Sequence, residues 1–279
     1  MTQYEPLRRG FAEFVGAFAL IFVGAGSVLT STVVFGQLVL GQQGILAGGF
    51  SLVAVAFAHG LVIAVMASAL GHISGGHFNP AITLGFVVTR RIAPALAVVY
   101  WVAQFAGGAC GALLLRWVFT ESTRNAASLG APATGQEITG VNPAGGLATR
   151  GVLDNPKAIV VEAVLTFFLV WVVFATATDP RGAFKSIAGL AIGLTITFDI
   201  LIGGPLTGAM MNPARAFGPE LVQRAWDDWY VWYAGPFGGA AIAALAYDYL
   251  FLRPVPRPIP VGEPGSGIAE PRPGITAES

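Results

Sequence analysis

Between Glu13 and Arg90 the sequence contains no Asp, Glu, Lys or Arg. A helix needs about 20 predominantly apolar residues to cross the hydrocarbon core of a bilayer, so this stretch has room for more than two crossings. The chain of 279 residues is 54% hydrophobic and only 11% charged. That balance is too apolar for a soluble domain of this size. The sequence therefore predicts a multi-pass membrane protein.

Six long apolar segments are predicted to cross the membrane as helices: 11–31, 49–71, 93–118, 157–178, 184–203 and 229–252. The N-terminal region lacks the pattern of a cleaved signal peptide, so the first segment is expected to remain as a span. Six spans put both termini on one side. Basic residues outside the spans are more numerous on that side, which favours cytoplasmic termini.

The connection 119–156 is polar and rich in Gly, Pro and Thr, and it is predicted to be an ordered or partly ordered external loop. The segment 253–279 is rich in proline and is expected to be a disordered cytoplasmic tail. A single membrane domain is expected over 1–252. The 37 glycines of this apolar chain predict closely packed helices, because small residues let helix backbones approach each other in lipid.

The two halves of the chain repeat each other, over about 8–118 and 157–252. The first span begins FAEFVGAFALIFVGAG and the fourth contains VVEAVLTFFLVWVVFA, so each carries a glutamate near its start, Glu13 and Glu162. In each half a second span, an Asn-Pro-Ala segment and a third span follow. Three spans separate the halves, and an odd number inverts the second half relative to the first.

The two Asn-Pro-Ala segments are SGGHFNPAITLG, with Asn79, Pro80 and Ala81, and GAMMNPARAFGPE, with Asn212, Pro213 and Ala214. Asn is a good N-cap and Pro suits the first helical position, so each segment predicts a helix start. Each helix would end at a basic residue, Arg90 or Arg224, after about half the membrane thickness. The inverted repeat predicts that the two positive helix ends meet near the midplane, where the loops before them line water.

The alternative interpretation is that these segments are ordinary Asn-Pro turns between helices. A third copy, 142–144 in TGVNPAGGLA, has no apolar run behind it and is predicted to be such a turn. The paired context and the inverted topology favour half-helices for the other two copies.

With the glutamates of the first and fourth spans, these motifs resemble the aquaporins, or major intrinsic proteins, over residues 8–252. The resemblance implies an all-α membrane protein of six transmembrane helices and two half-helices around one pore, assembled as a homotetramer. It implies passive passage of water, with ions and protons excluded. It also implies that Glu13 and Glu162 accept backbone N–H groups of the two loops and hold the loops in shape.

A selectivity filter is predicted from four residues. Arg215 lies one helical turn beyond Asn212, and a charge inside the membrane indicates a function. Its guanidinium can donate to passing water and repel cations. His59 lies in the outer half of the second span and Ile200 near the outer end of the fifth; with the loop residue Ala209 and Arg215 they fall at the filter positions of the family.

This filter resembles that of plant tonoplast intrinsic proteins, with His on the second span and Ile on the fifth. A wider and partly apolar opening follows, which hints at passage of ammonia, hydrogen peroxide and urea besides water. Glycerol facilitators typically carry Asp after the filter arginine, whereas Ala216 stands here. His77 is placed to line the inner pore, and Arg150 to reach the outer mouth. The role of Glu220 is left open.

Three alternatives stay open: a glycerol or small-solute facilitator, a proton-coupled transporter built from inverted repeats, and a structural membrane protein with a closed pore. The scarcity of intramembrane acids argues against the transporter. No nucleophile–base pair or metal-ligand cluster is apparent, so no enzyme activity, cofactor or metal is expected. A net charge of zero gives no indication of a nucleic acid partner. The excess of Ala, and of Arg over Lys, hints at a prokaryotic inner membrane.

Overall fold

The computed structural model describes residues 4–35, 44–141, 147–151, 153–182 and 185–253. Six helical stretches are long and apolar enough to cross a membrane: Pro6–Val34, Ser51–Ser74, Pro94–Val118, Asn155–Thr178, Ala188–Thr207 and Val231–Leu252. The six predicted spans are thereby confirmed. The predicted turn at 142–144 and all but the first residue of the predicted tail lie outside the described residues.

The first repeat starts with a span made of α1 (Pro6–Ala19), a π-helical turn (Leu20–Ala25) and α2 (Gly26–Phe35), and continues with α3 (Gly44–Ser74), α4 (Pro80–Val88) and α5 (Pro94–Val118). The second repeat contains α7 (Asn155–Val173), α8 (Ala188–Thr207), α9 (Pro213–Gln223) and α10 (Val231–Tyr247). The short helices α4 and α9 are about 14 and 16 Å long at 1.5 Å per residue, about half the hydrocarbon thickness.

The polar connection between the repeats has structure of its own. It holds the short helix α6 (Glu121–Ala126) and an antiparallel hairpin of β1 (Gln136–Val141) and β2 (Leu147–Gly151). The sequence predicts an ordered or partly ordered loop there, and the two strands add to that prediction. The β-branched residues Ile138, Thr139, Val141 and Thr149 favour extended backbone, and pairing the two segments satisfies their N–H and C=O groups.

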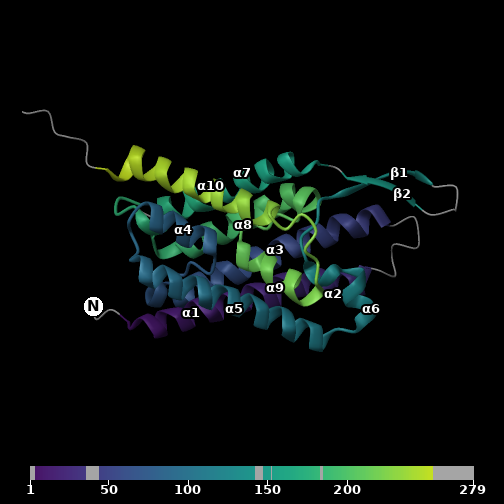
Figure 1. Ribbon diagram of the computed structural model, residues 1–279, viewed down its shortest axis with the longest axis horizontal. Helices are drawn as coiled ribbons and strands as arrows, with labels where there is room; N and C mark the ends of the chain where they lie inside the picture. The colour runs from purple at the N-terminus through teal and green to yellow at the C-terminus, as the bar shows by residue number, and fades with distance from the viewer. Residues whose placement is uncertain (1–3, 36–43, 142–146, 152, 183–184, 254–279) are drawn as a thin grey trace, which may run out of the picture.

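The inverted repeat is visible in the way the helices pack. In the first repeat α1 packs along α5, and in the second the equivalent helices α7 and α10 pack in the same way. The short helices are exchanged: α4 packs on α10 of the second repeat, and α9 packs on α5 of the first. The helices α3 and α8 pack on each other across the centre of the bundle (Figure 1). Each repeat therefore completes the other.

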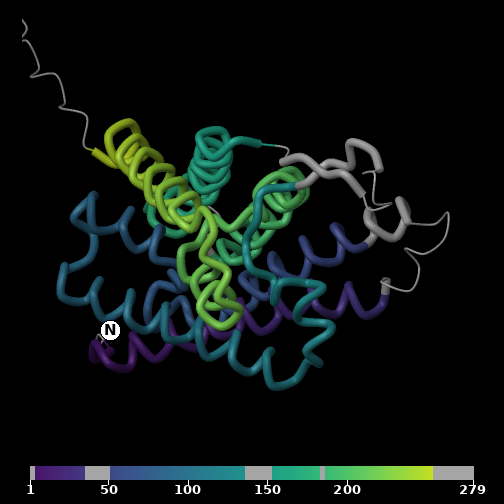
Figure 2. Tube along the Cα trace, turned by 45° about the vertical axis from the view of Figure 1, so that its right-hand side comes forward, coloured from purple at the N-terminus to yellow at the C-terminus, as the bar shows by residue number. Residues whose placement is uncertain are grey.

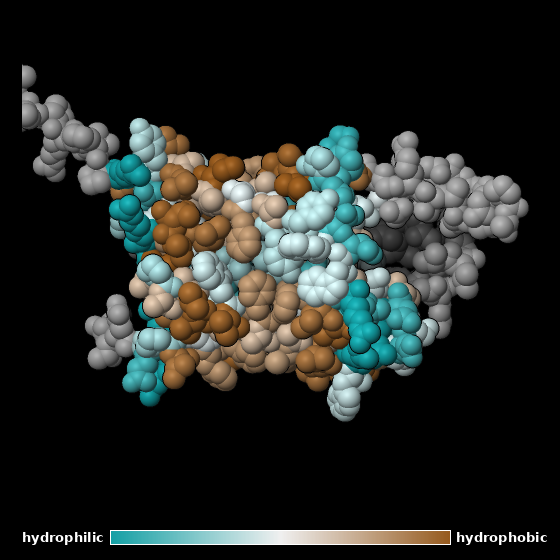
Figure 3. Space-filling model, viewed as in Figure 1, coloured by the Kyte–Doolittle hydropathy of each residue, from teal (hydrophilic) through white to brown (hydrophobic). Residues whose placement is uncertain are grey.

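The surface fits a bilayer. Brown apolar side chains form a belt between two teal polar ends on the face shown in Figure 3. The exposed apolar side chains of the protein include Phe57, Leu61 and Val65 on α3 and Ile242 and Leu245 on α10. The start of α1 and the end of α10 lie at the same end of the bundle (Figures 1 and 2), opposite the hairpin (Figure 1). The chain is an integral, multi-pass membrane protein, and the start of α1 and the end of α10 lie on the same side of the membrane.

Candidate functional site at the meeting of the half-helices

The N-termini of α4 and α9 meet inside the bundle, and Asn79 and Asn212 link them. Each side-chain oxygen caps its own helix: Ala81 N donates to Asn79 Oδ1 over 2.8 Å, and Ala214 N donates to Asn212 Oδ1 over 3.0 Å. Each amide nitrogen donates across the junction to the other loop. Asn79 Nδ2 donates to the carbonyl of Met211, and Asn212 Nδ2 to that of Phe78, both over 2.9 Å.

This arrangement leaves donors free in the middle of the bundle. An asparagine amide carries two N–H groups, and the described structure uses one of each pair for the other loop. Both asparagines line the central cavity. The remaining N–H groups and the two positive helix ends therefore favour a lone pair of a bound molecule and disfavour a cation.

The residue before each asparagine has left-handed backbone. Phe78 has a φ of 48° and Met211 a φ of 53°, although neither is glycine. Such a conformation costs about 1–2 kcal/mol per residue for an L-amino acid. It turns the carbonyls of Phe78 and Met211 toward the opposite asparagine, so the strain is held where the two loops join.

Glu13 on α1 holds the first loop. Its buried carboxylate accepts from the backbone N–H of His77 (3.0 Å) and of Phe78 (2.5 Å). It also accepts from Ser74 Oγ (2.6 Å) and Gln104 Nε2 (2.8 Å). The partners supply four donors to one carboxylate, which compensates for its burial.

Glu162 on α7 holds the second loop in the same register. Its carboxylate accepts from the backbone N–H of Met210 (2.9 Å) and Met211 (2.8 Å) and from Thr207 Oγ1 (2.7 Å). These partners stand one, two and five residues before Asn212, as Phe78, His77 and Ser74 stand before Asn79. Three of the donors are thus equivalent in the two loops, and Gln104 is a further donor to Glu13.

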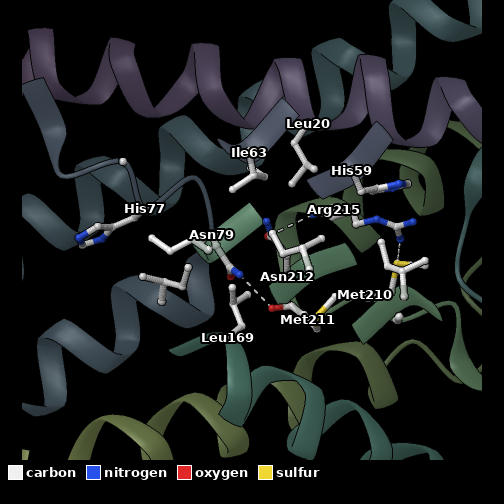
Figure 4. Close-up of a pocket in the computed structure, with 16 residues that line it drawn as sticks. Leu20, His59, Ile63, His77, Asn79, Leu169, Met210, Met211, Asn212 and Arg215 are labelled. Atoms are coloured by element: carbon white, nitrogen blue, oxygen red, sulfur yellow. Dashed lines mark hydrogen bonds between the residues drawn. The ribbon is translucent and has the colours of Figure 1, made fainter. Parts of the chain in front are cut away.

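A narrow cavity of about 30 Å³ runs past the two asparagines. In Figure 4 His77 lies at one end, Asn79 and Asn212 lie in the middle, and His59 and Arg215 lie at the other end. Between them the wall is apolar, formed by Leu20, Ile63, Ile82, Leu169, Ile192 and Ile196. A small molecule in this cavity finds hydrogen-bond partners only at separated points.

All four predicted filter residues line the cavity, and His59 and Arg215 lie at the end of it that is toward α6 (Figure 4). Arg215 sits in the first turn of α9, whose last residue, Gln223, donates to Asn125 of α6 over 3.1 Å. His59, Ile200, Ala209 and Arg215 are all buried, at 0%, 2%, 0% and 5% exposure. His59 Nδ1 lies 2.8 Å from the carbonyl of Val55, so this nitrogen is assigned the proton and Nε2 the lone pair.

The end of the cavity at His59 and Arg215 offers both kinds of hydrogen bond. His59 Nε2 and Arg215 Nε are buried and have no partner among the described residues. One can accept and the other can donate, which suits a molecule such as water. Ile200 and Ala209, which also line the cavity, add apolar surface.

His77 marks the opposite end of the cavity. Its Nδ1 lies 3.0 Å from Thr83 Oγ1, and His77 also lines an open vestibule of about 590 Å³. Arg91 lines the same vestibule and is paired with Asp248 beyond α10, at 2.6 Å. This end therefore faces the side on which the described chain starts and ends. Arg150 lies on β2, and its side chain is outside what the structure describes.

The apolar wall and Met210 were not predicted from the sequence. Met210 is 3% exposed, lines the cavity, and its sulfur accepts from Arg215 Nη1. The internal repeat of the sequence could have indicated some residues of the apolar wall. Leu20 and Leu169 both stand seven residues after the repeat glutamates, and Ile82 stands where Arg215 stands in the second repeat.

Among the described residues no group of three or more His, Cys, Asp or Glu side chains is placed to hold a metal ion.

Comparisons with known proteins agree with this arrangement. The family model for the major intrinsic proteins matches residues 1–247. The probable aquaporin TIP3-2 of Arabidopsis thaliana is 39% identical over 258 residues, covering 92% of this chain and 88% of that protein. Aquaporin TIP4-4 of Zea mays is 41% identical over 256 residues, covering 90% and 91%.

The fold also matches a solved structure, the aquaglyceroporin from Plasmodium falciparum, with a TM-score of 0.69. The match covers 88% of this chain and 97% of that one at 20% identity, so it shows the fold alone. The two sequence relatives are plant proteins, and they give no support to the expectation of a prokaryotic inner membrane.

Proposed function

The chain belongs to the major intrinsic protein family, and we propose on that basis that it is a passive transmembrane channel for water. The observation that carries the proposal is the narrow, mostly apolar cavity with hydrogen-bonding points at His77, at the two asparagines and at Arg215. Water can pass such a path by exchanging partners between these points, while the apolar wall between them offers nothing to hold it.

We propose that His59, Ile200, Ala209 and Arg215 form the selectivity filter. The free Nε2 of His59 and the free Nε of Arg215 support this role, because they are buried and lack partners among the described residues. Glu13 and Glu162 support the loops, and their hydrogen bonds to the four backbone N–H groups before the asparagines favour this role over proton relay.

The filter also favours small neutral solutes. Ile200 and Ala209 present apolar surface in place of polar side chains, so ammonia, hydrogen peroxide and urea are proposed as secondary substrates. Glycerol facilitation is less favoured, because Ala216 follows the filter arginine. A proton-coupled transporter is less favoured as well, since both loop glutamates are occupied by donors.

Ions and protons are excluded by charge. The positive ends of α4 and α9 and the Arg215 guanidinium all raise the energy of a cation inside the cavity. The asparagine N–H groups hold the oxygen of the central water, so that its hydrogens point away toward both mouths. A proton cannot then be relayed through the centre.

The assembly is proposed to be a homotetramer with one pore per subunit, and the termini are proposed to be cytoplasmic. The family resemblance supports the first proposal and the distribution of basic residues the second. Composition is the only support for a prokaryotic inner membrane. Native mass spectrometry in detergent tests the subunit number, and protease access to terminal tags in spheroplasts tests the orientation.

The function is tested by stopped-flow light scattering on proteoliposomes. An osmotic step should shrink them much faster than empty liposomes, with a low activation energy. Urea and glycerol steps then rank the solutes. In the double variant His59→Phe/Ile200→His the urea entry should fall while water passage remains. Shrinkage no faster than that of empty liposomes would refute the channel, and unchanged urea entry in the double variant would refute the filter.

A further inference from the structure

A methionine sulfur lies at the narrow filter end of the cavity. Met210 directly follows Ala209, its side chain lines the cavity, and its sulfur accepts from Arg215 Nη1 (Figure 4). The backbone N–H of Met210 is held by Glu162 over 2.9 Å. Its place relative to Asn212 is that of His77 relative to Asn79. Two equivalent positions thus mark the two ends of the cavity.

The other methionines have different surroundings. The chain has four, and Met1 is outside the described residues. Met66 belongs to α3, packs against the hydrophobic core and does not line the cavity. Met211 lines the cavity near the asparagines, with its carbonyl bonded to Asn79. Only the sulfur of Met210, among the described methionines, is in contact with the filter arginine.

We propose that Met210 is an oxidation site of the filter: hydrogen peroxide moving along the cavity converts its thioether to the sulfoxide, and the sulfoxide lowers water permeability. This inference rests on the proposed function, because the oxidant reaches a buried sulfur by the water path. Hydrogen peroxide is a small, neutral molecule that donates and accepts hydrogen bonds, like water. It fits the same hydrogen-bonding points.

The reaction is balanced with peroxide alone. The sulfur lone pair attacks one peroxide oxygen, an S–O bond forms, and the O–O bond breaks. The departing hydroxide takes the proton of the transferred oxygen and leaves as water. Sulfur is oxidised by two electrons and peroxide is reduced by two. The free N–H of Arg215 Nε lies on the adjacent side chain and can hydrogen-bond the departing oxygen.

The product changes the filter in two ways. The sulfoxide adds an oxygen to a place where the cavity is already narrow. It also replaces a weak sulfur acceptor by a strong oxygen acceptor beside the Arg215 guanidinium. The arginine donors are then bound to the protein and no longer free for passing water. Methionine sulfoxide reductases reverse the change.

The test uses the full chain in proteoliposomes with and without hydrogen peroxide. Peptide mapping with fragmentation separates added oxygen on Met210 from that on Met211 and Met66. Water permeability is measured on the same samples. The variants Met210→Leu, Met211→Leu and Met66→Leu remove one sulfur each with little change in volume. Each variant is compared with its own untreated sample, so basal differences drop out.

The expected result is oxidation of Met210 ahead of Met66, a severalfold loss of water permeability, recovery after treatment with methionine sulfoxide reductases, and no loss in Met210→Leu. Oxidised Met210 with unchanged permeability, oxidation confined to the other methionines, or an equal loss in Met210→Leu would each overturn the proposal. If the untreated protein passes no water, the proposed function fails. The peptide map still decides whether Met210 is the oxidised residue.

Discussion

At the scale of single residues, Glu13 and Glu162 stabilise equivalent loops in the two repeats. Each carboxylate accepts hydrogen bonds from the backbone N–H groups of the two residues before the asparagine of its loop. Each also accepts from the side-chain hydroxyl of the residue five positions before that asparagine. Those N–H groups point into protein at membrane depth, where water cannot replace a missing acceptor. The loops therefore depend on acceptors from α1 and α7.

We predict that Glu162→Gln and Glu13→Gln destabilise the protein, each by about 1–3 kcal/mol per buried donor left without an acceptor. The amide replaces one acceptor oxygen by a donor that faces other donors. The measurement is the free energy of unfolding in detergent. Glu220→Gln is the matched control, because this buried glutamate has one partner among the described residues, Tyr233 Oη at 2.9 Å, and Gln can keep it. An equal loss in the control would contradict the special role of the loop pair.

The two ends of the cavity differ in charge because one position breaks the repeat. Three residues after each asparagine stand Ile82 and Arg215. The arginine is buried at the end of the cavity where His59 lies, and Ile82 is part of the apolar wall. The positive charge is thus placed at a single mouth.

We predict that Arg215→Val keeps water permeability and raises proton conductance by about tenfold, as expected if the barrier falls by about 1.4 kcal/mol. Removing the guanidinium removes a charge that repels cations, while the asparagine donors stay. A pH-sensitive dye inside proteoliposomes measures the leak. Arg215→Lys keeps the positive charge, so its proton conductance should stay as low as that of the unchanged protein. A variant without leak would show that the helix ends suffice for exclusion.

At the scale of elements, helix contacts depend on glycines that face another backbone. A Cβ built on Gly239 of α10 would lie 2.0 Å from the carbonyl oxygen of Ala163 on α7. The neighbouring Gly238 has nothing within 4 Å of such a Cβ. One helix thus presents a glycine that is needed for close packing next to one that is not.

We predict that Gly239→Ala destabilises the protein by about 1–3 kcal/mol, because α10 must move away from α7 to make room. Gly238→Ala should be neutral or stabilising by up to about 1 kcal/mol, since Ala favours helix. Unfolding in detergent measures both. Equal effects of the two substitutions would contradict close backbone contact at Gly239.

The end of α7's span is held to α10 by a buried acid. Asp179 is 5% exposed and accepts from the guanidinium of Arg181 (3.0 and 2.8 Å), from its backbone N–H (2.9 Å) and from Tyr247 Oη (3.2 Å). The Arg181 side chain, its backbone N–H and Tyr247 together hold the pKa of the Asp179 carboxyl well below its usual range. The acid lies just beyond the span, on the side of the termini.

This shift predicts a pH dependence of stability. Because the folded pKa is depressed, the contribution of Asp179 is fully present above its unfolded pKa of about 3.9 and is lost as the pH falls below that value. The melting temperature of Asp179→Asn should therefore lie below that of the unchanged protein at pH 7, with a gap that narrows below about pH 4. The exposed Asp227→Asn is the control. A gap that stays constant down to pH 3 would contradict the ion pair as its cause.

At the scale of the whole molecule, the repeats are interlocked rather than side by side. The half-helix of each repeat packs on the last span of the other, and each asparagine bonds to the opposite loop. Neither half can therefore complete its own loop or its share of the cavity alone.

We predict that the chain can be cut between β1 and β2, within 142–146, if both pieces are expressed together. The two pieces should assemble and give water permeability of the same order as the intact chain, whereas each piece alone should be degraded. Co-purification on a tag carried by one piece, followed by stopped-flow measurement, tests this. A single piece that is stable and monomeric would contradict the interlocked arrangement.

The sequence by itself determined the membrane class, the six spans, the inverted repeat and the two helix starts. Each follows from local chemistry: apolar length, a capping Asn with Pro behind it, and a pattern that recurs. Only the tertiary structure decided which side chains share the cavity. Met210 and the apolar wall come from several helices and loops, and their meeting depends on packing between residues far apart in the chain. The hairpin in the polar connection also depended on a pairing that neither strand specifies alone.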